Sequence, residues 1–299
     1  MMAKRPAALV LIVTAAGLAT LGVWFAGRGP DLSSTRADSG FRDYNVYMPP
    51  GDRSGGVGCP TVLVVHGGCG VWGDKSWPAP TALSRWLARD GFRVVNVNYR
   101  LAPGAPYPAA IMDVEAVARD FSRDRPVFLI GISYGALLAE AVAAMQPHQV
   151  RGLVALSGVH DPGTLDNPWL MLSMGPTSCT SGLVRSPLRQ ATGAFPPTLL
   201  VHGDVDRVVP FEQASFAART LRALGCEVSL IRLAGCGHVD DFKPTVYRIA
   251  YPYIRAWLAA RCARANPTPT PAGGPHAPQS SRTSRERASR LTLRPRTVT

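Results

Sequence analysis

Hydrophobic and polar positions form alternating short blocks from about residue 41 to residue 260. Short apolar runs rich in β-branched residues are typical of buried strands, and longer segments with one apolar face are typical of helices. The pattern predicts strands at 41–48, 61–65, 93–99, 127–130, 152–156, 198–202 and 227–233, and helices at 78–90, 108–122, 136–145, 211–224 and 244–260. This alternation favours an α/β fold, a mostly parallel twisted sheet with helices on both faces.

The most informative stretch is Gly131-Ile132-Ser133-Tyr134-Gly135, between a predicted strand and a predicted helix. A serine between two glycines at such a turn matches the nucleophile elbow, which holds a serine hydroxyl clear of the backbone. Side chains at either glycine would clash in so tight a turn, and the start of the helix directs a positive dipole at the site. The sequence predicts Ser133 as a catalytic nucleophile, and the alternative is an ordinary turn.

A nucleophilic serine needs a base, and the base needs a third group to orient it. His238 lies in a glycine-rich loop after the last predicted strand, and Asp206 lies in the loop after the strand before it. Loops at the C-terminal ends of parallel strands converge on one edge of a sheet. The order Ser133, Asp206, His238 is the one expected for a hydrolase of this type. We predict these three as the catalytic residues, with Asp204 as an alternative acid.

A second glycine-rich segment, His66-Gly67-Gly68-Cys69-Gly70, follows the strand at 61–65. A tetrahedral oxyanion needs N–H donors that are already in place where its charge develops. The backbone N–H groups of Gly68, Cys69 and Tyr134 are the candidate donors. His66 and Gly67 are predicted to support this loop, although an ordinary glycine turn is the alternative.

The remaining histidines are predicted to have no catalytic role. His202 is expected to anchor a loop in the core, and His148 and His160 are expected at the surface or in a cap. The cap is the irregular region 159–197, which is longer than an ordinary connection and is predicted to offer apolar contacts to a substrate. A loop that packs on the core is the alternative.

The chain begins with a candidate export segment. Lys4 and Arg5 precede an apolar run from about Ala7 to Ala26, so residues 1–27 are predicted to be a signal peptide or a membrane anchor. The basic flank would stay inside, which places the folded domain outside the cytoplasm, either anchored in the membrane or secreted. A buried helix of the domain is the alternative, and residues 28–40 are predicted to be a linker.

The formal net charge of +12 is unevenly distributed. The domain is predicted to span residues 41–263, and the tail 264–299 is predicted to be disordered because it is rich in Pro, Thr, Ser and Arg. From Asn266 onward it contains six arginines and one glutamate. The tail is either simply solvated or attracted to anionic lipid or envelope polymer. No nucleic-acid-binding motif accompanies the charge, so no nucleic-acid partner is predicted.

These motifs resemble those of α/β-hydrolase fold esterases and lipases, near the hormone-sensitive-lipase-like and the feruloyl-esterase or arylformamidase-like groups. The matching segments are His66–Gly68, Gly73–Lys75, Asn98–Pro103, Tyr107–Ala110, Asp113, Gly131–Gly135, His202–Asp206, Val209-Pro210 and Gly237-His238. The resemblance implies hydrolysis of a small acyl ester through an acyl-enzyme, without a cofactor. Cys69 departs from the pattern where many members have a third glycine, and Tyr134 replaces a small residue.

Two rival functions remain open at this stage. An amidase or peptidase could use the same scaffold, and an inactive hydrolase-like protein could bind the cell envelope. The complete set of Ser133, Asp206 and His238 argues against the inactive protein. The sequence contains no signal for an oligomeric state.

The six cysteines of a predicted exported domain suggest disulfides. By their places relative to the predicted strands, Cys226 and Cys262 would share one end of the sheet, and Cys69 and Cys236 the other. The hypothesis is therefore that the pairs Cys226–Cys262 and Cys69–Cys236 form. No metal site is predicted, because no Cys-x-x-Cys or His-x-x-x-His spacing is present.

Overall fold

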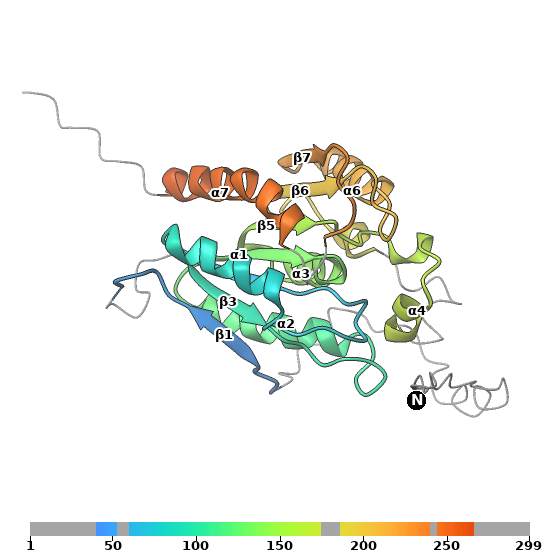
Figure 1. The fold of residues 1–299 in the computed structure, drawn as a ribbon, viewed down its shortest axis with the longest axis horizontal. Coiled ribbons are helices and arrows are strands. Elements are labelled where there is room, and N and C mark those ends of the chain that lie inside the picture. Colours follow the sequence, from blue (N-terminus) through green and yellow to red (C-terminus); the bar gives the residue numbers. More distant parts are fainter. Residues whose placement is uncertain (1–39, 53–59, 175–185, 240–243, 266–299) are drawn as a thin grey trace, which may run out of the picture.

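The computed structural model describes residues 40–52, 60–174, 186–239 and 244–265. Helices and strands alternate along this part of the chain (Figure 1). The strands are β1 Tyr44–Tyr47, β2 Thr61–Val65, β3 Arg93–Val97, β4 Val127–Ile132, β5 Val150–Leu156, β6 Thr198–Gly203 and β7 Val228–Leu233. The helices are α1 Pro78–Arg89, α2 Ala109–Phe121, α3 Tyr134–Met145, α4 Pro168–Met174, α6 Glu212–Ala223 and α7 Thr245–Ala265, with short 3-10 turns η3 Pro147–Gln149, η4 Pro162–Thr164 and η5 Pro187–Gln190.

The strands form one sheet in the order β1-β3-β2-β4-β5-β6-β7. Only β1, which pairs with β3, runs antiparallel among the described strands. Every residue of β2, β4 and β6 is buried, as expected for strands covered on both faces. Because the other strands are parallel, the loops after β4, β6 and β7 meet at one edge of the sheet.

Helices cover both faces of this sheet, with a separate hydrophobic cluster under each layer (Figure 1). One cluster packs α2, α3 and α6 against the sheet, and the other packs α1 and α7 against the opposite face. Strand β4 contributes side chains to both clusters: Leu129 belongs to the first cluster, whereas Phe128 and Ile130 belong to the second. This follows from the alternation of side chains along a strand. The predicted α/β architecture is therefore confirmed.

The region 159–197, predicted to be irregular, contains the short helix α4. Its proline at position 168 fits the first turn of a helix, where no N–H is needed. The side chain of Asn167 accepts hydrogen bonds from the N–H groups of Trp169 and Leu170 at 3.0 and 3.1 Å. This is the arrangement of a helix N-cap, and the Asn-Pro pair is the sequence signal that could have predicted α4.

The predicted N-terminal segment at residues 1–27 and most of the tail predicted at 264–299 lie outside the described residues. Helix α7 runs to Ala265, past the predicted domain end at residue 263. Within the described ranges, none of the helices combines the length and the apolar character that crossing a bilayer requires.

Neither predicted disulfide is present. Cys69, Cys226, Cys236 and Cys262 are all free, and the other two cysteines of the sequence lie outside the described residues. The pairing of Cys226 with Cys262 fails because the two side chains pack against the hydrophobic clusters on opposite faces of the sheet. The positions of Cys226 and Cys262 in the sequence predicted that both lie at one end of the sheet, but not which face of the sheet each side chain contacts.

Candidate active site

Ser133 occupies the turn between β4 and α3, with φ of 53° and ψ of −117°. A residue other than glycine rarely adopts a positive φ, and the surrounding structure must hold it there. The N–H of Ser133 donates to the Leu156 carbonyl at 2.9 Å, and its own carbonyl accepts from Val159 at 3.1 Å. A Cβ on Gly135 would lie 2.2 Å from the Val65 carbonyl oxygen, so this turn requires glycine.

The side chains of Ser133, His238 and Asp206 meet at the edge of the sheet. His238 Nε2 lies 3.0 Å from Ser133 Oγ, and His238 Nδ1 lies 2.7 Å from Asp206 Oδ2. If Nδ1 donates its hydrogen to the carboxylate, Nε2 is left free to accept the hydrogen of the serine hydroxyl. The imidazole side chain is 17% exposed, whereas that of Asp206 is fully buried. This geometry can activate a serine hydroxyl.

The carboxylate of Asp206 is held from several directions. Oδ1 accepts from the N–H groups of Val208 and Val209, both at 2.9 Å, and His202 Nε2 lies 3.3 Å from Oδ2. His202 also donates to the Val209 carbonyl at 2.8 Å, as a loop anchor would. Burial alone would raise the pKa of Asp206, but the hydrogen bonds from His202 and His238 outweigh it and hold the pKa below its ordinary value. Asp206 is therefore a carboxylate at neutral pH.

Asp204, the alternative acid, has other partners. Its carboxylate accepts from Arg232 Nε at 3.1 Å and from the Gly235 N–H at 2.7 Å. A Cβ on Gly203 would lie 2.2 Å from the Cys236 carbonyl oxygen, so the loops after β6 and β7 touch through their backbones. Asp204 therefore braces these two loops against each other.

The glycine-rich loop after β2 lies beside the elbow, since a Cβ on Gly135 would also approach the His66 carbonyl oxygen to 2.5 Å. Gly68 and Cys69 both have positive φ, of 103° and 52°. In the described part of the chain, the N–H groups of Gly68, Cys69 and Tyr134 have no backbone acceptor. For Tyr134 this follows from its place at the start of α3. All three remain available as donors.

His66 and Tyr99 brace this loop from below. The Tyr99 hydroxyl donates to the carbonyls of His66 and Gly67 at 3.0 and 2.9 Å, and its ring stacks on His66 with centroids 4.4 Å apart. His66 Nδ1 donates to the Gly67 carbonyl at 2.8 Å. Burial lowers the pKa of His66 to about 4, so the imidazole is neutral at pH 7. Sequence reasoning assigned Tyr99 no such contact.

The two departures from the family pattern both contact the cap. The ring of Tyr134 is buried so close to the loop that a Cβ on Gly70 would lie 2.7 Å from it. Burial raises the pKa of the Tyr134 hydroxyl, and Ser173 of α4 approaches Gly70 beside the same ring, since a Cβ on Gly70 would lie 2.8 Å from the Ser173 Cβ. The Cys69 sulfur accepts from Asn167 Nδ2 at 4.0 Å. The elbow and the glycine-rich loop are thus tied to the region around α4.

A second histidine–carboxylate pair lies behind the elbow. His160 Nδ1 is 2.5 Å from Glu140 Oε1, and the exposed fractions of these two side chains are 1% and 0%. Of the two places predicted for His160, the surface is wrong, because the loop after β5, where the predicted cap region begins, turns inward over α3. A Cβ on Gly158 would lie 2.8 Å from the His160 ring, so glycine makes room for this turn.

Gln213 of α6 connects the loop after β5 to the loop after β6, which contains Asp206. Its side-chain oxygen accepts from the N–H groups of His160 and Asp161 at 2.9 and 2.7 Å. Its own N–H donates to the Pro210 carbonyl at 2.9 Å, next to the loop that holds Asp206. A glutamine in an amphipathic helix has no sequence signal for this role, because only the fold brings the two loops together.

A parallel sheet with a serine elbow after β4, and with an acid and a histidine after β6 and β7, has the architecture of α/β-hydrolases. The family of the alpha/beta hydrolase fold matches residues 62–240, which is more than half of the chain. The protein therefore belongs to the alpha/beta hydrolase fold family. Among the residues that the structure describes, no group of three or more His, Cys, Asp or Glu side chains could hold a metal ion.

Curated relatives include both esterases and peptidases. Esterase LipC of Mycobacterium tuberculosis is 28% identical over 230 residues, which cover 64% of this chain and 57% of LipC. The uncharacterized peptidase YuxL of Bacillus subtilis is 26% identical over 217 residues, covering 64% of this chain and 32% of YuxL. The chain thus spans little more than half the length of the first relative and about a third of the second.

Solved structures share the fold. A truncated carbohydrate esterase from gut microbiota superposes with a TM-score of 0.62 at 18% identity, covering 78% of this chain and 94% of that one. EstE1, a thermophilic carboxylesterase from a metagenomic library, superposes with a TM-score of 0.61 at 23% identity, covering 73% and 84%. At these identities the likeness supports the architecture of the chain.

Proposed function

We propose that the protein hydrolyses carboxylic esters through an acyl-enzyme. Ser133 Oγ attacks the ester carbonyl while His238 Nε2 takes its proton, and the same proton then passes to the leaving alcohol as the C–O bond breaks. A water molecule repeats the sequence to release the acid and restore the serine. The observation that supports this most directly is the chain of contacts from Ser133 Oγ to His238 at 3.0 Å and from His238 to Asp206 at 2.7 Å.

The N–H groups of Gly68, Cys69 and Tyr134 are the proposed donors to the oxyanion. They are backbone groups on a loop and a helix start that lie side by side, so no side chain has to move for them to act. His66 and Gly67 support the loop, because both carbonyls are held by the Tyr99 hydroxyl. The proposed substrates are small or medium acyl esters, and the mechanism requires no cofactor or metal.

Labelling with a fluorophosphonate tests this proposal. We expect the wild-type protein to be labelled and Ser133→Ala to remain unlabelled, together with loss of hydrolysis of p-nitrophenyl esters. Ser157→Ala is a matched control, because Ser157 is a buried serine with positive φ in the adjacent loop and should still permit labelling. A wild-type protein that is neither labelled nor active would support a binding role for the scaffold.

Amide hydrolysis is a second candidate, because YuxL, which is named as a peptidase, matches 64% of the chain, the same share as the esterase LipC. Besides YuxL, the acylamino-acid-releasing enzyme of Rattus norvegicus is 25% identical over 224 residues. The Ser133, His238 and Asp206 side chains can serve either reaction. Comparing kcat/KM for matched aminoacyl p-nitrophenyl esters and aminoacyl p-nitroanilides separates them, and faster cleavage of the anilides would favour a peptidase.

We also propose that the domain acts outside the cytoplasm. The support is the order of the N-terminal residues, Lys4 and Arg5 followed by the apolar run 7–26. Fractionation of cells that express the full chain, with N-terminal sequencing of the recovered protein, tests whether the segment exports the domain and whether it is cleaved.

A further inference from the structure

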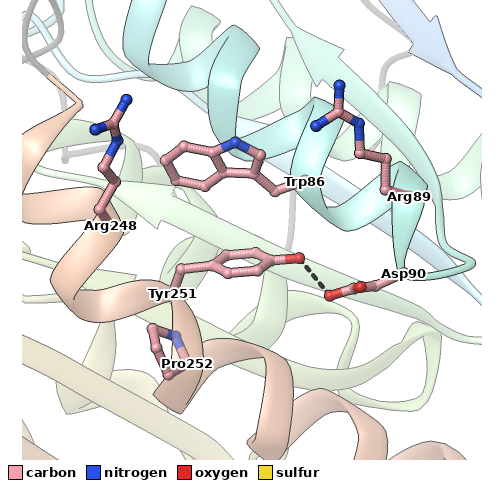
Figure 2. A pocket seen from close by; sticks show the side chains of 6 residues that line it. All are labelled: Trp86, Arg89, Asp90, Arg248, Tyr251 and Pro252. Carbon is pink, nitrogen blue, oxygen red and sulfur yellow. Dashed lines mark hydrogen bonds between the residues drawn. The ribbon is translucent and has the colours of Figure 1, made fainter.

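A surface groove of about 310 Å³ lies between α1 and α7 (Figure 2). None of the residues of the proposed active site lines it. Both helices belong to the layer that covers one face of the sheet. The groove is lined by Trp86, Arg89, Asp90, Arg248, Tyr251 and Pro252.

The floor of the groove is aromatic and its one acid is already paired. Trp86 and Tyr251 meet edge to face, with ring centroids 5.3 Å apart. The Tyr251 hydroxyl donates to Asp90 Oδ2 at 2.6 Å, and Arg255 Nε lies 2.9 Å from the same oxygen. Asp90 therefore has its charge balanced by Arg255 and is not available to neutralise a further cation.

Two arginines at the groove have no such partner among the described residues. Figure 2 shows the Arg89 and Arg248 side chains on either side of the Trp86 ring. Both side chains are exposed, and neither has a hydrogen bond or an ion pair with any residue that the structure describes. An apolar floor between two guanidinium groups that no described residue pairs fits a partner that is apolar in part and carries several negative charges.

The apolar surface continues beyond the groove onto the solvent-facing side of α7. Ile249 and Tyr253 are 46% and 47% exposed and, four residues apart, are neighbours on the helix. Trp, Tyr and Arg are the side chains that favour the boundary between lipid headgroups and acyl chains. The same helix leads directly into the segment from Asn266 to Thr299, which has six arginines and one acid.

We propose that the α1/α7 groove and the outer side of α7 dock on a bilayer that contains anionic phospholipid. Headgroup phosphates pair with Arg89 and Arg248, while Trp86, Tyr251 and Tyr253 contact the region just below the headgroups. The basic segment after α7 adds a longer-range attraction to the same surface. None of these residues belongs to the proposed catalytic machinery, so docking and hydrolysis can fail independently.

Partition of the full-length protein into vesicles tests this proposal. The test variant is R89Q/R248Q, and the matched control is R219Q/R222Q, which removes two exposed arginines from α6 on the other face of the sheet. With phosphatidylcholine–phosphatidylglycerol vesicles we expect the test variant to bind about tenfold or more weakly, since each arginine near an anionic surface contributes about fivefold. The control should bind like the wild type, and ester hydrolysis should be unchanged in both variants.

Equal weakening of both variants would show that binding follows total charge, and would overturn the proposal. So would unchanged binding of R89Q/R248Q in an assay in which R219Q/R222Q and the wild type can be displaced from the vesicles. If the N-terminal segment keeps every variant bound, hydrogen exchange on the vesicles decides. Slower exchange of peptides from α1 and α7 in the wild type and the control, but not in R89Q/R248Q, supports docking at this face, whereas exchange that does not differ among the three contradicts it. Inorganic phosphate serves as a competitor for the bound protein. If it displaces the protein from the vesicles as well as added anionic vesicles do, the groove binds the free anion, and the proposal is overturned.

Discussion

Two regions of the molecule contain the same chemical pair, a histidine Nδ1 against a buried carboxylate. His238 and Asp206 form it at the loop edge of the sheet, where the imidazole is 17% exposed and its Nε2 faces Ser133 Oγ. His160 and Glu140 form it between the β5 loop and α3, where the imidazole is 1% exposed and its Nε2 has no partner among the described residues. The difference lies in what the second nitrogen reaches.

The two pairs share the way the imidazole is oriented but differ in whether a substrate can reach it. In both places a carboxylate orients an imidazole, but only His238 has a hydroxyl beside it and an open side from which substrate can approach. His160 instead positions the loop whose N–H groups hold the Ser133 carbonyl and contact Gln213. We therefore expect substitutions in the first pair to affect kcat and substitutions in the second pair to affect stability.

The largest effect should come from the hydroxyl that distinguishes the two pairs. Ser133→Ala should lower kcat by about 10⁶-fold, the scale on which loss of a serine nucleophile acts. Steady-state hydrolysis of a p-nitrophenyl ester measures it, with the circular dichroism spectrum as a folding control. Residual activity within tenfold of the wild type would mean that another group attacks the ester.

The matched carboxylate variants test the comparison directly. Asp206→Asn should lower kcat by about 10⁴-fold, because an amide no longer selects the histidine tautomer or stabilises its charged form. Glu140→Gln makes the same chemical change in the buried pair and should leave kcat near that of the wild type. An equal loss in both variants would show that the buried pair takes part in the reaction.

The free energy of unfolding should respond most to changes in the His160–Glu140 pair, whereas kcat responds to changes in the His238–Asp206 pair. His160→Leu or Glu140→Leu alone should lower the free energy of unfolding by about 3–5 kcal/mol, because each leaves a buried polar partner unpaired. The double variant should cost less than the sum of the two. Urea denaturation measures these values, and His148→Leu, at an exposed site, is the control that should stay close to the wild type. Additive costs would mean that the pair contributes no coupling.

His66, which is also buried, gives the smallest effect, through the pH dependence of stability. The pKa of His66 falls from 6.5 in an unfolded chain to about 4 in the fold because of burial. Between these values the unfolded chain binds a proton that the folded chain does not, so stability should fall as the pH is lowered. The loss should reach about 3 kcal/mol by pH 4. Urea titrations of the wild type and His66→Gln at several pH values test this, and the variant should lack this part of the slope.

Sequence patterns predicted the element order and the loops that carry the candidate site. They succeeded because buried parallel strands are continuous apolar runs and because Ser133 lies in a motif whose glycines are required by backbone contact. The structure brings Ser133, Asp206 and His238 within hydrogen-bond distance, as their order in the chain predicted. Their catalytic role remains a prediction until it is measured.

The features that the sequence did not predict are contacts between elements that are distant in the chain. They depend on which faces of those elements pack together. The burial of His160 could not be predicted, because its partner Glu140 lies on another element and no local pattern connects them. Cys226 and Cys262 were paired by their positions at the ends of elements, but the sheet lies between their side chains. Gln213 was missed for the same reason, since its contacts join loops that are distant in the chain.

The strand β5, which lies between the strands that lead to Ser133 and to Asp206, limits where the chain can change in length. β5 separates β4 from β6, and its loop is bonded on one side to Ser133 and on the other to the Val201 carbonyl through the Ser157 N–H. A residue inserted between Leu156 and His160 would disturb these bonds and widen the distance between Ser133 and Asp206, which the His238 imidazole has to bridge. An insertion after Asp161 leaves the distance between Ser133 and Asp206 unchanged. New cap segments can therefore be added there while the side chains of Ser133, His238 and Asp206 keep their spacing.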